Sequence, residues 1–77
     1  MKNKVELLNM IVNSGTIDID DYYVVRMHTS IDIQGEYTDE KIEKLIERNF
    51  IIKKEHQANN YVYFRHKNLL GVKVILT

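Results

Sequence analysis

The chain has 77 residues, and its 11 basic and 11 acidic side chains give no net charge when histidine is neutral. This length corresponds to one domain, so we expect residues 1–77 to fold as a unit. The absence of cysteine excludes disulfides, thiolate metal sites and cysteine nucleophiles. Residues 1–49 carry six basic and ten acidic side chains, whereas residues 50–77 carry five basic and one acidic. The basic C-terminal part is therefore suited to contact phosphate.

The N-terminal segment predicts a helix over residues 4–14. Its apolar residues recur at the spacing of one helical face: Val5, Leu8, Ile11 and Val12. Gly15 follows, where a helix C-cap favours a positive φ. Leu7 and Met10 lie off this face, so the helix is either buried in the core or covered by a second copy in a homodimer. The segment is too polar for a signal peptide and too short to span a bilayer, which indicates a cytoplasmic protein without a membrane segment.

Residues 16–37 allow two interpretations. Three acidic residues could cap a helix over residues 20–29, because carboxylates favour a helix N-terminus. Alternatively, the sequence Tyr-Tyr-Val-Val at residues 22–25 is rich in strand formers. A helix here completes a small winged-helix-like α+β domain. A strand instead gives a mixed α+β sheet with helices at residues 4–14 and 38–49.

A second, well-capped helix is expected over residues 38–49. Thr38 is a suitable N-cap, and Asn49 tolerates the left-handed conformation that often ends a helix. Ile42, Leu45 and Ile46 predict the buried face of this helix.

A β-hairpin with strands at residues 50–56 and 61–66 follows this helix. Asparagines in the loop around residues 58–60 suit its left-handed turn. Alternation places one set of side chains in the core: Phe50, Ile52, Val62 and Phe64. The opposite face carries Lys53, Glu55, Tyr61, Tyr63 and Arg65. A further strand is predicted at residues 72–76, where Val72, Val74 and Leu76 alternate with Lys73 and Ile75.

The helix over residues 38–49 has two charged flanks. Successive residues advance by roughly 100° around the axis, so Lys41, Lys44 and Arg48 share one flank. Glu40, Glu43 and Glu47 share the other. The basic flank could contact backbone phosphates. As an alternative without a binding role, these residues form an ordinary solvated helix surface with an i,i+4 pair.

The run from residue 38 to residue 65 resembles the recognition helix and wing of winged helix-turn-helix proteins. IEKLIERNFIIKK, residues 42–54, is similar to the helix–strand junction of multiple-antibiotic-resistance and phenolic-acid-repressor type regulators, with Asn49 where those families usually have glycine. The closing VKVILT is similar to their returning strand. The resemblance implies a DNA-binding transcription or replication regulator whose partner is double-stranded DNA. It assigns phosphate contacts in the wing to Lys53, Lys54, Arg65 and Lys67, with stacking or hydrogen bonds from Tyr61 and Tyr63.

An alternative function is a protein-interaction module, such as a phage-type inhibitor that binds a host protein through an acidic face. That face would consist of Asp18, Asp20, Asp21, Glu40, Glu43 and Glu47, which could mimic nucleic acid in a basic groove. The frequent Asn, Lys, Ile and Tyr are typical of AT-rich genomes, such as those of some phages and plasmids.

Catalytic and metal-binding patterns are missing from the sequence. His28, His56 and His66 are scattered and lack the spacing of metal ligands. The three glycines are too far apart to form a phosphate-cradling loop. We therefore expect neither an enzyme nor a bound metal or cofactor.

Overall fold

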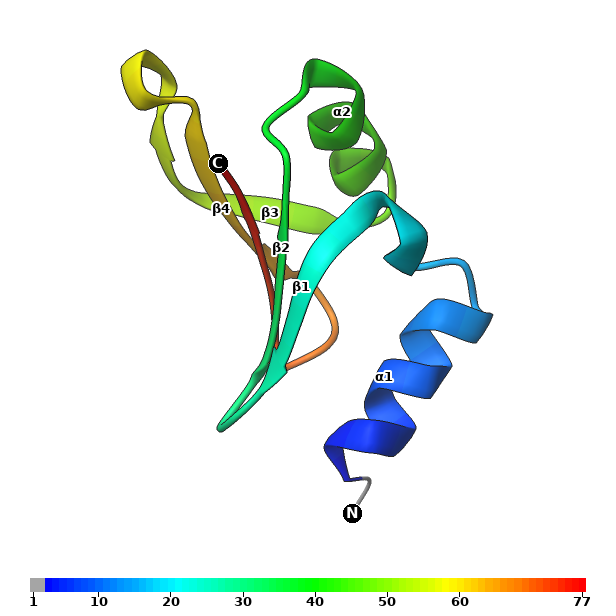
Figure 1. Ribbon diagram of the computed structural model, residues 1–77. Coiled ribbons are helices and arrows are strands. Elements are labelled where there is room, and N and C mark those ends of the chain that lie inside the picture. Colours follow the sequence, from blue (N-terminus) through cyan, green and yellow to red (C-terminus); the bar gives the residue numbers. More distant parts are fainter. Residues whose placement is uncertain (1–2) are drawn as a thin grey trace.

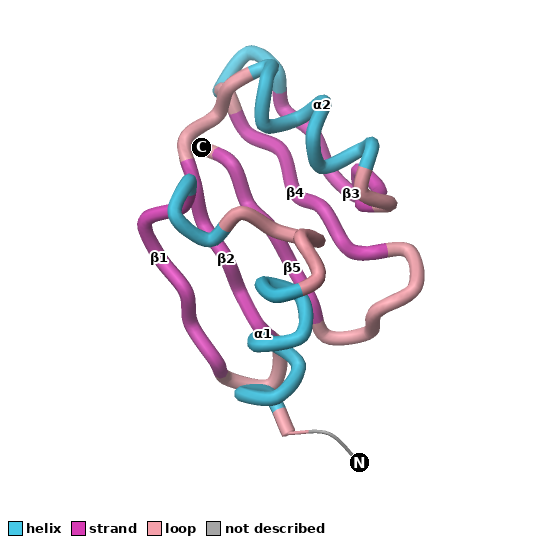
Figure 2. Tube along the Cα trace, turned by 90° about the vertical axis from the view of Figure 1, so that its right-hand side faces the viewer, coloured by secondary structure: helices cyan, strands magenta, loops and turns pink. Residues whose placement is uncertain are grey.

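The computed structural model describes residues 3–77 and shows an α+β fold. Two helices, α1 (Lys4–Asn13) and α2 (Asp39–Glu47), lie on the same face of a five-stranded sheet (Figures 1 and 2). In the described part of the chain, the other face of the sheet carries no α-helix (Figure 1). Within residues 3–77, no helix is both long and apolar enough to cross a membrane.

The sheet is mixed, with its last strand in the centre. Its strands are β1 (Tyr22–Met27), β2 (Ile31–Gly35), β3 (Phe50–His56), β4 (Tyr61–His66) and β5 (Val72–Leu76). Their order across the sheet is β1-β2-β5-β4-β3. The pair β2–β5 is parallel, and the other three pairs are antiparallel. The chain therefore crosses from β2 over α2 to the far edge, and the strands then return inward to β5.

The helix expected over residues 20–29 is wrong, and the strand interpretation of this segment is confirmed. Only Ile19–Asp21 forms a single 3-10 turn, after which Tyr22–Met27 pairs with β2. The β-branched and aromatic residues prevail because the edge of β2 offers this segment a ladder of hydrogen bonds, interrupted by a single bulge at Tyr23. The described residues thus contain a β1–β2 hairpin in the place where a winged helix would have its second helix.

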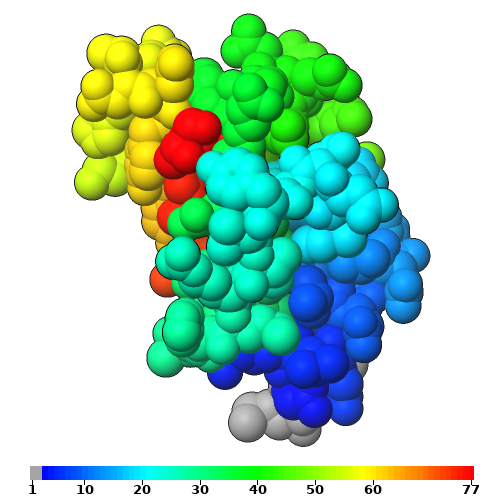
Figure 3. Space-filling model, in the orientation of Figure 1, coloured from blue at the N-terminus to red at the C-terminus, as the bar shows by residue number. Residues whose placement is uncertain are grey.

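The predicted strands of the C-terminal half are confirmed. The hairpin strands have the expected bounds, and Asn60 at their loop adopts a left-handed conformation with φ 50°. A β-bulge between Ile52 and Lys54 shifts the register of β3, so Glu55 lies opposite Val62 and not on the face with Tyr63. Beyond the bulge, the tip of the hairpin projects from the body of the molecule (Figure 3).

The helix caps follow the sequence signals. The side chain of Asn3 accepts a hydrogen bond of 2.9 Å from the Glu6 N–H, and Thr38 accepts one of 3.2 Å from the Lys41 N–H. Asn49 ends α2 with φ 70°, and Gly15 follows α1 with φ 77°. Both left-handed positions occur where a helix end needs them.

The core lies between the helices and the inner face of the sheet. It contains Ile11, Ile17, Ile31, Ile33, Leu45, Phe50, Val62, Phe64, Val72, Val74 and Leu76. Three residues predicted to be buried are exposed at its margins, and two of them lie on helices: Val5 is 55% exposed on α1, and Ile46 is 51% exposed on α2. Ile52 is also partly exposed, because β3 is an edge strand. The apolar stripes are therefore only partly buried, as the thin core of a small domain allows.

Candidate nucleic-acid interface

The face of the sheet opposite the helices, called here the outer face, carries the alternate residues of each strand. In β2, β4 and β5 the buried residues alternate with half-buried ones, and the half-buried set includes Gln34, Tyr63 and Ile75. Because successive side chains of a strand point to opposite faces, this set faces away from α1 and α2. The register aligns Gln34 with Ile75 and Ile75 with Tyr63, so their side chains form a row across the three central strands.

The outer face is strongly basic. A second row runs across the sheet through Arg26, Asp32, Lys73 and Arg65, each aligned with the next. Lys54 lies opposite Tyr63, and Lys53 occupies the bulge beside it. Five cations therefore share this face with two carboxylates. Asp32 already accepts a hydrogen bond of 2.6 Å from the Ser30 hydroxyl. Glu36 lies two residues after Gln34, beside Thr77, where backbone hydrogen bonds extend the pairing of β2 with β5. Arg65 and Lys73 are direct cross-strand neighbours of like charge, an arrangement that a bound anion would stabilise.

Aromatic rings accompany these cations. Tyr61 and Tyr63 are two residues apart on β4, which separates their side chains by about 6.6 Å along the strand. The His56 ring lies 5.9 Å from the Tyr61 ring, measured between centroids. Tyr23, in the bulge of β1, is 62% exposed, and its hydroxyl shares a hydrogen bond of 3.2 Å with the Thr77 side chain. The face thus combines cations with rings that are accessible to a flat ligand.

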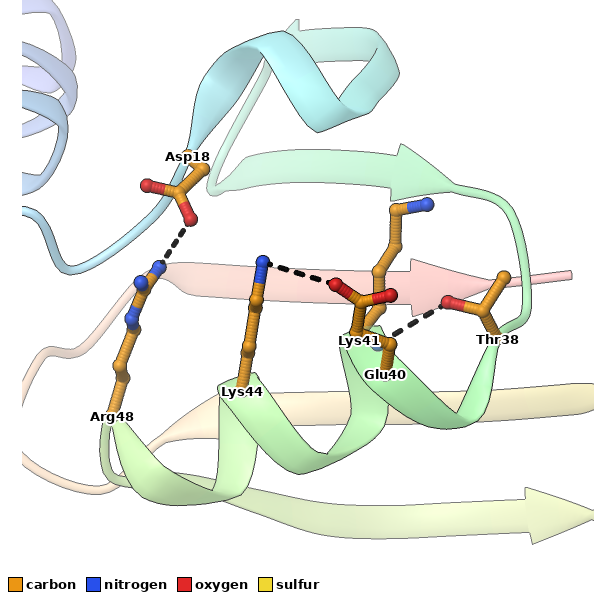
Figure 4. Close-up of polar contacts among 6 residues, drawn as sticks. All are labelled: Asp18, Thr38, Glu40, Lys41, Lys44 and Arg48. Atoms are coloured by element: carbon orange, nitrogen blue, oxygen red, sulfur yellow. Dashed lines mark hydrogen bonds and ion pairs between the residues drawn. The ribbon is translucent and has the colours of Figure 1, made fainter.

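The basic flank of α2 lies on the other side of the sheet and is partly ion-paired. The Arg48 guanidinium donates to Asp18 at 2.8 Å, and the Lys44 ammonium lies 3.5 Å from Glu40 (Figure 4). Lys41 extends from the same helix toward the strand that leads into Thr38, which is β2 (Figure 4). The nucleic-acid-binding residues expected from the sequence are therefore divided between two faces: Lys41, Lys44 and Arg48 on α2, and Lys53, Lys54, Tyr63 and Arg65 on the outer face. Lys67 lies in the connection from β4 to β5.

The acidic residues of the alternative function do not form a separate surface. Asp21 and Glu40 line a shallow depression together with Lys41 and Lys44. Asp18 is paired with Arg48, whereas Asp20, Glu43 and Glu47 are exposed. The region around α2 consequently has mixed charge.

Sequence reasoning missed several outer-face residues. Arg26 and Lys73 were not singled out, because their position in one charged row depends on the placement of β2 and β5 side by side. The alternation of Lys73 and Ile75 with buried residues indicates that both lie on the exposed face of their strand. It does not indicate which strands lie beside that strand. Tyr23 could not be assigned to a face, because the sequence left its segment open between a helix and a strand.

Tyr22, on the inner side of β1, has a shifted pKa. Burial, followed by the carboxylates of Asp21 and Asp18, raises the pKa of Tyr22 to about 12, and Arg48 partly opposes this. This phenol stays neutral at physiological pH and acts as a packing group. No cluster of three or more His, Asp or Glu side chains in residues 3–77 could hold a metal ion.

Comparison of the chain with protein-family models, curated proteins and solved structures gave no match.

Proposed function

We propose that this protein binds nucleic acid through the outer face of its sheet and acts as a small regulator of transcription or replication. The observation that carries the proposal is that five cations and three tyrosines share, with only two carboxylates among the described residues, a face that neither α1 nor α2 covers. Phosphate contacts from Lys and Arg supply most of the affinity of such proteins.

The tyrosines favour a single-stranded ligand. In a duplex the base faces are stacked on one another, so rings on a sheet gain little from them. In a single strand each base can stack on an aromatic side chain, which contributes about 1–3 kcal/mol per base. Sheets that present aromatic side chains in this way are one general solution to single-strand recognition.

The winged-helix resemblance independently supports a role of the β3–β4 hairpin in binding phosphates. The order of α2 followed by β3 and β4 is that of a recognition helix and its wing. In that resemblance the wing contacts phosphates, which assigns the role to Lys53, Lys54 and Arg65. The α2 flank is left out of the proposed interface, because it lies on the other side of the sheet and Arg48 and Lys44 are each engaged with a carboxylate.

The test is fluorescence anisotropy with labelled single strands of about ten nucleotides, as DNA and as RNA, and with a duplex of the same sequence. Affinity is measured at about 50 and about 200 mM salt, and we expect it to fall steeply because bound counterions are released. Tyr63→Ala should weaken single-strand binding by roughly 5- to 150-fold, the equivalent of about 1–3 kcal/mol.

Lys41→Ala is the matched control, since Lys41 lies on α2 and should leave single-strand affinity within about twofold. Circular dichroism checks that both variants remain folded. If no strand binds at low salt, the proposal fails. A loss that is larger for Lys41→Ala, with duplex preferred, would instead move the interface to α2.

A further inference from the structure

A pocket of about 230 Å³ lies at one corner of the sheet. It is bounded by the first half of β3, the end of β4 and the connection from β4 to β5, which is orange in Figure 1. Three of its lining residues are cations, Lys53, Arg65 and Lys67, and His66 lies beside them. Lys53 and Arg65 belong to the outer face, so the pocket is continuous with the proposed interface.

The charge of the pocket is uncompensated. No carboxylate lines it, and the two ion pairs formed within the described part of the chain both lie at α2. Lys73 faces Arg65 across β4 and β5 and adds a fourth cation nearby. Cations held this close repel one another, and an anion placed among them removes that repulsion.

The backbone around the pocket is held in place. The Lys67 N–H donates to the Asn49 carbonyl at 2.8 Å, and the Asn68 N–H donates to His66 Nδ1 at 3.1 Å. His66 also packs edge-on against the Phe50 ring, with centroids 4.8 Å apart. At the other end of the connection, the Gly71 carbonyl accepts a hydrogen bond of 2.7 Å from the Ile31 N–H. A ligand would therefore not have to order this connection, which lowers the cost of binding.

The remaining wall of the pocket is apolar and accessible. Leu70 is 93% exposed, Ile51 is 42% exposed, and Leu69 completes the lining. An exposed leucine beside three cations suits a ligand that joins an apolar ring to an anionic group. A nucleotide has this combination, because its base is flat and largely apolar on its faces while its phosphate is charged.

We infer that this pocket binds the phosphate monoester of a nucleotide at the end of a strand that lies on the outer face. The inference rests on the proposed function. A phosphate monoester carries a charge of about −1.5 to −2 at neutral pH, whereas an internal phosphodiester carries one negative charge, so three cations match the monoester better. The base of the terminal nucleotide lies against Leu70 and Ile51. A free mononucleotide offers the same chemistry and is the other source of the group.

The experiment compares single strands of identical sequence that end in a 5′-phosphate, a 3′-phosphate or hydroxyl groups alone. We expect one phosphorylated end to bind roughly fivefold tighter than the hydroxyl form, the equivalent of about 1 kcal/mol. Lys53→Ala should bring this ratio close to one. Lys54→Ala is the matched control: it removes a neighbouring lysine of the outer face that does not line the pocket. It should weaken all strands by the same factor and keep the ratio.

The outcomes separate the two proposals. If strands bind but neither terminal phosphate improves affinity, the pocket inference is overturned and the proposed function stands. An effect of Lys54→Ala on the ratio equal to that of Lys53→Ala also overturns the pocket inference. If no strand binds but adenosine monophosphate binds the native protein and not Lys53→Ala, the pocket holds a free nucleotide and the proposed function fails. If neither strands nor adenosine monophosphate bind, both are refuted.

Discussion

Gly35 ends β2 at a point where the chain has no space for a side chain. A Cβ atom added there would lie 2.5 Å from Tyr22 Cδ1 and 3.0 Å from Tyr22 Cε1. Tyr22 is the direct cross-strand partner of Gly35, so its ring lies over the glycine. On the other side, the same Cβ would lie 3.4 Å from Leu76 Cδ2. We therefore expect Gly35→Ala to destabilise the protein through the Tyr22 ring.

The magnitude follows from the size of the overlap. Carbon atoms prefer a separation of about 3.5–4.0 Å, so the ring must move by about 1 Å. Overpacking of this kind costs about 1–3 kcal/mol. Replacing glycine also reduces the conformational entropy of the unfolded chain, which stabilises the folded state by about 0.4–1 kcal/mol. The net loss should be about 1–2 kcal/mol, which for a domain of this size lowers the Tm by about 4–16 °C.

A double-mutant cycle followed by urea and thermal unfolding, with circular dichroism as the signal, tests this reasoning. Tyr22→Val removes the clashing Cδ1 and Cε1 atoms while keeping a good strand former. Gly35→Ala should be destabilising in the native background, and neutral or stabilising by up to about 1 kcal/mol in the Tyr22→Val background. The explanation is refuted if Gly35→Ala has no effect on the native protein, or if its cost is the same in both backgrounds.

Two further predictions concern charged groups. The pKa of Tyr22 is raised from 10.0 to about 12 in the folded state, so its phenol is neutral in both states below pH 10. As the pH rises from 10 to 12, the phenol ionises only in the unfolded chain, and the free energy of unfolding therefore falls. Between pH 9 and pH 11, the free energy of unfolding measured with urea should fall by about 1 kcal/mol more in the native protein than in Tyr22→Phe. An identical pH dependence in both proteins would contradict the raised pKa of Tyr22. Arg48→Ala should cost less than about 1 kcal/mol of stability, because its ion pair with Asp18 is partly exposed. It should also leave single-strand affinity within about twofold in the anisotropy assay, and a larger loss would assign Arg48 to the binding surface.

The sequence by itself determined the local structure. Thr38 and Asn49 mark the ends of α2, and both act as the caps that their side chains favour. The hairpin of β3 and β4 was readable because its strands alternate and its loop contains Asn60 in a left-handed conformation. These signals act over a few residues, so no distant contact is needed to interpret them.

Local signals were insufficient where two conformations compete. The segment at residues 20–29 has acids that suit a helix start and also Tyr22 to Val25, which favour a strand. Pairing with β2 decides for the strand, and β2 in turn is fixed by its parallel ladder with β5, about forty residues away in the sequence. The bulge at Lys53, which moves Glu55 to the other face, was also invisible in the alternating pattern.

The candidate site shows the same division. The residues of the hairpin were identified from their types and spacing, since Tyr63, Lys54 and Arg65 lie on two adjacent strands. The outer face as a whole was decided only by the tertiary structure, which inserts β5 between β2 and β4 and so aligns Arg26, Lys73 and Arg65 in one row. The alternation of buried and exposed side chains along a strand can be predicted from residues that are adjacent in the sequence. The order of strands in a sheet depends on which distant segments bury their apolar faces together under α1 and α2.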